Sequence, residues 1–160
     1  MGMRRLLLGT VLVLLASGPA LAQARAIEGV WGMTITLRDC ATGTPMGPPF
    51  TTLLTFHQGG TVSESNGSPG YAPNQRTQGH GLWNHASGST FGLRMVAAIL
   101  FTTPPSPPAP GFLAGWQVLT STLTVTSDDA LTGVARADFY DVNRQPYRSA
   151  CPTVTGERFR

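Results

Sequence analysis

Residues 29–38, GVWGMTITLR, carry the pattern that determines the fold. Apolar side chains stand at every second position from Trp31 to Leu37, and glycine or threonine fills the positions between them. Because successive side chains of a β-strand point to opposite faces, this alternation predicts a strand with one buried and one wet face. Downstream, threonine, valine, phenylalanine and glycine dominate, turn residues recur at short intervals, and helical periodicity is almost absent. The pattern therefore predicts an all-β protein.

Eight strands can be placed between the turn signals of this chain. We expect them at 29–38, 50–57, 60–65, 78–86, 89–103, 113–126, 131–141 and 148–159. Sequential strands joined mostly by tight turns predict a single eight-stranded antiparallel up-and-down barrel, because closure removes both exposed edges of the sheet. A two-sheet β-sandwich is the alternative that the sequence leaves open.

Two of the expected strands bear on the interior of such a barrel. The segment 89–103 is apolar on both faces, which is typical of a strand that is covered on both sides or lines a cavity. In 131–141, one face carries Leu131, Gly133, Ala135, Ala137 and Phe139, and the central three are small. An eight-stranded barrel can be filled by side chains or can hold one small ligand, so both possibilities stay open.

The N-terminal residues are typical of an export signal. Arg4 and Arg5 precede an apolar run at 6–16, and the small-x-small sequence 20–22 follows it. We expect 1–22 to be a signal peptide cleaved after Ala22, with one barrel domain over 23–160. Export would follow the general secretory route to the periplasm or the outside. The apolar run is too short for a transmembrane anchor, so none is expected after cleavage.

Charge and cysteine content narrow the range of partners. The formal net charge is +3, it falls to +1 without Arg4 and Arg5, and the chain has no lysine. No basic stripe is visible, so we expect no nucleic-acid partner. In an exported protein, the two cysteines, Cys40 and Cys151, predict a disulfide that ties the end of the first strand to the start of the last. Two separate buried thiols are the alternative.

Gly29-Val30-Trp31 adds a resemblance to a known family. A Gly-x-Trp sequence that opens the first strand of an exported all-β chain of this size resembles the lipocalins and the wider calycin barrels. The resemblance implies that Trp31 plugs one end of the barrel and that an arginine near the C-terminus packs across it. Arg158 is the matching candidate and Arg160 the second. The motif also suits barrel-type protease inhibitors, avidin-like barrels and small cyclase barrels.

Residues 78–90, QGHGLWNHASGST, place two histidines around a tryptophan. His80 and His85 are an odd number of positions apart, so on a strand they point to opposite faces. A catalytic zinc site needs about three protein ligands, and none stand at suitable spacing here, so we expect no metal and no cofactor. Trp83 and His85 share a face. They form part of a ligand-binding wall, or Trp83 fills the core and His85 lies at the rim.

Two sets of candidate site residues follow from these patterns. Catalytic candidates are Glu64, His57 and His85, because burial of Glu64 would raise the pKa of its carboxyl and suit it to proton transfer. An exposed Glu64 would be an ordinary strand residue. The expected ligand-binding residues are Trp83, His85, Met95, Trp116 and Phe139.

Three functions are compatible with these features. The sequence favours an exported barrel that holds a small apolar or amphipathic ligand in its interior. The second is a protein-interaction or inhibitor-like barrel that acts through the loops 39–49, 66–77 and 104–111. The third is a cofactor-free cyclase or isomerase, which requires Glu64, His57 or His85 inside a cavity. No nucleophile or phosphate-binding motif is present, so the sequence leans away from an enzyme.

Overall fold

A computed structural model describes residues 26–65, 67–100 and 113–160. The expected signal peptide with its cleavage after Ala22 lies outside these residues, as do the proline-rich loop 104–111 and the end of the strand expected at 89–103. No helix within the described ranges has the length and apolarity that a membrane span requires.

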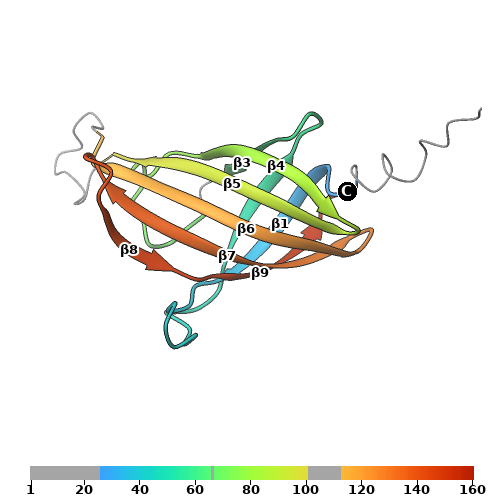
Figure 1. The fold of residues 1–160 in the computed structure, drawn as a ribbon, viewed down its shortest axis with the longest axis horizontal. Helices are drawn as coiled ribbons and strands as arrows, with labels where there is room; N and C mark the ends of the chain where they lie inside the picture. The colour runs from blue at the N-terminus through green and yellow to red at the C-terminus, as the bar shows by residue number, and fades with distance from the viewer. Residues whose placement is uncertain (1–25, 66, 101–112) are drawn as a thin grey trace, which may run out of the picture.

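Nine antiparallel strands form one sheet in the described chain (Figure 1). They are β1 Gly29–Thr36, β2 Phe50–Phe56, β3 Thr61–Ser65, β4 Gly79–Ser87, β5 Thr90–Ile99, β6 Gly115–Ser127, β7 Ala130–Asp141, β8 Pro146–Ala150 and β9 Thr153–Arg158. Each strand from β1 to β7 pairs with the next, and β9 pairs with both β7 and β1. The sheet therefore closes on itself. The prediction of an eight-stranded up-and-down barrel is confirmed, and the sandwich alternative is wrong.

The ninth strand arises because the segment expected as one strand at 148–159 is interrupted. β9 pairs with the first half of β7 and β8 with its second half. Between them, Cys151 donates its N–H to the carbonyl of Arg38, and Pro152 accepts from Ala135. Proline has no N–H to continue the ladder, so regular pairing stops there. β8 is thus the extension of the last barrel strand beyond the point where β1 ends.

The two ends of the barrel differ in the length of their connections. The hairpin turns β2–β3, β4–β5 and β6–β7 lie at the end where β1 begins, and the C-terminus lies there too (Figure 1). The longer connections β1–β2, β3–β4 and β5–β6 all join strands at the opposite end. We call the end with the hairpin turns the closed end and the end with the longer connections the open end.

Side chains pack the closed half of the barrel tightly. The alternation predicted for 29–38 is confirmed, because Trp31 and Met33 are buried while Thr34 is exposed. The buried cluster combines Ile27 with inward residues from β1, β2, β3, β5, β6, β7 and β9, and Trp83 of β4 packs against it. Its largest fully buried side chains include Trp31, Phe56, Phe91, Met33, Leu123 and Leu131.

The open half is braced by the predicted disulfide. Cys40 and Cys151 are bonded, with their Cα atoms 4.9 Å apart, so that prediction is confirmed. The bond joins the β1–β2 connection to the junction of β8 and β9, where the pairing between β1 and the last strand ends. It therefore ties these two segments together just beyond Thr36 and Thr153, the last residue pair between β1 and β9.

Candidate ligand-binding site

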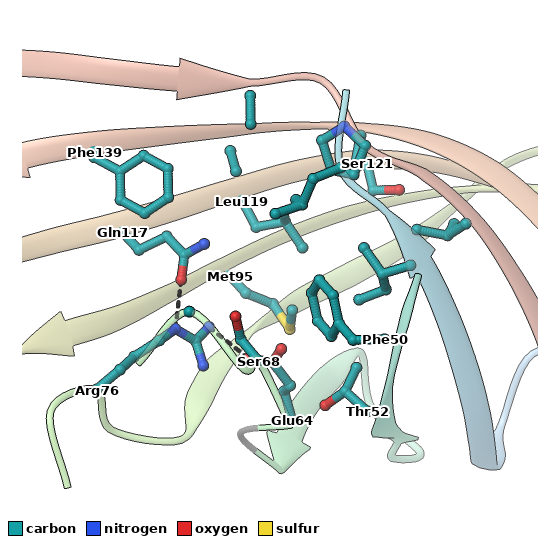
Figure 2. Close-up of a pocket in the computed structure, with 18 of the residues that line it drawn as sticks. Phe50, Thr52, Glu64, Ser68, Arg76, Met95, Gln117, Leu119, Ser121 and Phe139 are labelled. Atoms are coloured by element: carbon teal, nitrogen blue, oxygen red, sulfur yellow. Dashed lines mark hydrogen bonds and ion pairs between the residues drawn. The ribbon is translucent and has the colours of Figure 1, made fainter. Parts of the chain in front are cut away.

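The open half of the barrel contains a cavity of about 410 Å³. That volume lies within the range of about 300–1,000 Å³ that is usual for small-molecule sites. Its wall is largely apolar and comes from most of the strands; Figure 2 shows part of it. The apolar side chains include Met33, Phe50, Leu54, Met95, Leu119 and Phe139.

Small residues explain why this half is hollow. Ala135 and Ala137 of β7 face Ala150 of β8 and Ser121 of β6 around the cavity, and none of them reaches far inward. The inward face predicted for β7 is correct, but its two halves differ. At Gly133, in the packed half, an added Cβ would lie only 2.6 Å from a Leu123 methyl group, so large neighbours already fill that space. Towards the open end the space stays free.

A buried ion pair stands in the wall of the cavity. Arg76 Nη2 lies 2.6 Å from Glu64 Oε2, and the two side chains are 6% and 11% exposed. Arg76 Nε also donates to the side-chain oxygen of Gln117 (Figure 2). Opposite Glu64, β4 carries Gly79, where an added Cβ would approach the carboxylate oxygen to 2.5 Å. Glycine at that position therefore makes room for the carboxylate inside the barrel.

Arg76 belongs to the connection between β3 and β4, which is anchored to β5. Gln75 accepts from the N–H of Leu100 at 2.8 Å, and Thr77 donates to Ala98 at 3.0 Å. These bonds hold the backbone of Arg76 beside the end of β5 and direct its side chain into the barrel. Arg76 could not be predicted from the sequence pattern, because alternation carries no information about residues outside strands.

Aromatic and cationic side chains surround the mouth of the cavity. Tyr71 lies on the β3–β4 connection and Tyr147 and Arg148 on β8, and all three border the cavity. The Arg148 guanidinium carbon lies 5.4 Å from the ring centre of Phe139. Burial raises the pKa of the Tyr71 phenol to about 12, and the nearby Arg76 and Arg148 charges partly oppose this shift. Tyr71 is therefore a neutral hydrogen-bonding group at physiological pH.

Replacing Arg76 by methionine is expected to lower the free energy of unfolding by about 2–3 kcal/mol. The change leaves the Glu64 carboxylate without its counter-ion. The loss should be smaller than in fully enclosed ion pairs, because water can enter the cavity. Urea unfolding measures it.

Arg136→Met is the matched control. The Arg136–Asp138 ion pair lies at the surface, with side chains 56% and 23% exposed, and should contribute at most about 1 kcal/mol. Equal losses in the two variants would show that the Arg76–Glu64 pair is not buried as described.

The predicted ligand-binding residues fall into two groups. Met95 and Phe139 line the cavity. Trp83 instead packs in the closed half between Phe56 and Phe91, at ring-centre distances of 6.3 and 5.9 Å. Of the two placements expected for Trp83, the structure therefore shows the one in which its ring packs against the core.

His85 and Trp116 also lie away from the cavity. The His85 ring contacts Phe91 and lies 2.7 Å from the carbonyl oxygen of Gly88 in the β4–β5 turn. Trp116 alternates with Gln117, which borders the cavity, so the tryptophan ring lies on the outer face.

The three catalytic candidates are not brought together. Glu64 borders the cavity, whereas His57 is exposed in the β2–β3 turn, where its ring nitrogen lies 2.9 Å from the Ser63 hydroxyl. His85 lies at the same closed end. Within the described ranges, no three histidine, cysteine or acidic residues are grouped so that they could hold a metal ion. Of the three candidates, Glu64 therefore borders the cavity, and the two histidines lie at the closed end.

Trp31 and Arg158 lie together at the closed end. The Arg158 guanidinium carbon is 4.3 Å from the Trp31 ring centre, and Trp31 Nε1 donates to the carbonyl of Ile27 at 2.8 Å. Arg158 in turn donates to the carbonyls of Ala26, Glu28 and Asp128. The arginine therefore links the N-terminal residues, the β6–β7 turn and the last strand across the base of the barrel.

The fold and cavity define a class of architecture. A closed eight-stranded antiparallel barrel with one packed and one hollow half is consistent with a calycin-like barrel. No protein-family model matches the chain, and no curated protein matches it either.

Proposed function

We propose that this barrel binds one small apolar or amphipathic ligand in the cavity of its open half. The observation that carries the proposal is the cavity itself, which combines an apolar wall with a few convergent polar groups. Small-molecule sites commonly have this composition, with the apolar surface supplying affinity and the polar groups fixing orientation.

Each part of the wall has a role in this proposal. Met95, Phe139 and Leu119 supply apolar contact area, and methionine adapts its shape to a ligand. Gln117 and the Glu64–Arg76 pair present polar atoms toward the mouth. A ligand with its apolar part deep in the barrel and its polar part toward the open end would satisfy both.

We also propose that the protein acts outside the cytoplasm. The N-terminal sequence is of the signal-peptide type, and the Cys40–Cys151 disulfide supports an oxidising compartment, where such bonds persist. Periplasmic and secreted locations fit equally.

A second candidate function is protein recognition through the loops. The favouring observation is that the three longest connections all join strands at the open end, where a partner could contact them together. This function does not require the cavity to be occupied, so a ligand-binding measurement separates the two.

Replacing Ala135 by phenylalanine is expected to weaken ligand binding at least tenfold. Ala135 faces Ser121 inside the cavity, and a ring there would occupy the ligand's space. The test is a fluorescence titration with N-phenylnaphthylamine, a small neutral probe that brightens in apolar surroundings. Wild-type protein should bind it saturably at one site.

Val134→Phe is the matched control, because Val134 is the preceding residue on β7 and is 60% exposed on the outer face. It should bind the probe like wild type. Circular dichroism of both variants checks the fold. The proposal would be contradicted if wild type did not bind the probe saturably, or if Ala135→Phe bound the probe as tightly as wild type.

A further inference from the structure

The charges that border the cavity are unevenly balanced. In the wall of the cavity, the charge of Arg76 is compensated by Glu64 at 2.6 Å. At the mouth, Arg148 borders the same cavity and is exposed. The side-chain ion pairs of the described ranges involve Arg76, Arg136 and Arg160, and Arg148 takes part in none of them. Among the described charged side chains that line the cavity, that of Arg148 therefore has no ion-pair partner.

The acidic residues nearest to Arg148 in the sheet are already engaged elsewhere. Asp138 pairs with Arg136 and accepts from the Ser149 hydroxyl. Asp141 accepts from the N–H groups of Asn143 and Gln145, and so shapes the β7–β8 turn. Neither carboxylate forms an ion pair with Arg148.

Packing holds the Arg148 guanidinium at the mouth. It lies over the ring of Phe139, which itself borders the cavity, and Tyr147 packs 6.3 Å from the same ring. A cation–π contact does not require the guanidinium N–H groups as hydrogen-bond donors, so they remain available to a ligand. Tyr71, on the β3–β4 connection, borders the same cavity as a neutral hydrogen-bonding group.

We propose that the ligand is anionic, with an apolar tail in the cavity and one anionic headgroup, such as a carboxylate, held by Arg148 at the mouth. A guanidinium edge matches the two oxygens of a carboxylate and forms charge-assisted hydrogen bonds with them. The inference rests on the proposed function, and it adds the charge of the ligand and the position of its headgroup.

The test compares two probes with the same tail, decanoate and decan-1-ol, by displacement of N-phenylnaphthylamine at low ionic strength and neutral pH. Three proteins are measured: wild type, Arg148→Gln and Arg94→Gln. Arg94 is exposed on the outer face of β5, between cavity-lining Leu93 and Met95, so its replacement controls for the change in net charge.

Wild type is expected to bind decanoate more tightly than decan-1-ol. Arg148→Gln should weaken decanoate binding roughly fivefold, the effect of an ion pair at a partly exposed site, and leave decan-1-ol unchanged. Arg94→Gln should match wild type with both probes. Added salt should reduce the preference of wild type for decanoate.

The outcomes separate the two proposals. If wild type binds decan-1-ol but shows no preference for decanoate, or if Arg148→Gln affects both probes equally or neither, the anionic headgroup is wrong and the binding cavity stands. If neither decanoate nor decan-1-ol displaces the fluorescent probe from wild type, both proposals are wrong for this ligand class.

Discussion

Replacing Cys40 and Cys151 together by alanine is expected to lower the free energy of unfolding by about 4 kcal/mol. The disulfide joins residues 111 positions apart, so it removes a large share of the conformational freedom of the unfolded chain. Cys40 is exposed and Cys151 half-buried, so the alanines cost little packing. Guanidinium unfolding followed by circular dichroism measures the loss.

Reduction provides the control for this prediction. Wild type unfolded in the presence of a thiol reductant should match the double variant, because both lack the same bond. A loss below about 1 kcal/mol would show that the disulfide adds little to the constraint imposed by the barrel. Free thiols in the oxidised protein would contradict the pairing itself.

Replacing Trp31 by alanine is expected to lower the free energy of unfolding by about 4 kcal/mol. The Trp31 side chain is fully buried at the closed end and is the largest such side chain in the described core. Its removal leaves a cavity, deprives the Ile27 carbonyl of its donor, and removes the ring over which the Arg158 guanidinium carbon lies at 4.3 Å. Thermal and urea unfolding measure the effect.

Trp116→Ala separates the closed-end packing from the general loss of an indole ring. Trp116 is half-buried on the outer face of β6, so its removal opens no enclosed cavity. Trp116→Ala should lower the free energy of unfolding by about half as much as Trp31→Ala, or less. Equal losses of unfolding free energy in the two variants would mean that Trp31 stabilises the fold no more than a half-buried tryptophan on the outer face.

Local alternation predicts the architecture well, because the period of a strand is a property of consecutive residues. Trp31 and Met33 face inward as the pattern of 29–38 requires, and the small face of β7 points into the barrel. The interruption of the last strand is harder to predict in full. Pro152 has no N–H for the ladder, but the bond from the Cys151 N–H to the carbonyl of Arg38 joins residues far apart in sequence. β8 and β9 still both pair with β7, so the barrel closes despite the interruption.

The candidate site is less predictable, because alternation gives the face of a side chain but not its depth along the barrel. Trp83 packs among inward rings in the closed half, which is already filled. Around Trp116 both faces of the strand carry apolar residues, so its outward direction leaves no signal in the sequence. Arg76 contacts Glu64 from a connection, and Arg148 owes its place to strand register at the mouth.

We expect the exported protein to carry a small ligand in the hollow half of its barrel. Native mass spectrometry of the full chain, expressed with its N-terminal segment and isolated gently from the exported fraction, tests it most directly. We expect an intact mass above that of the processed, oxidised chain, and a single small anionic amphipathic compound released on denaturation. A bare chain that also fails to take up added decanoate or decan-1-ol would contradict it.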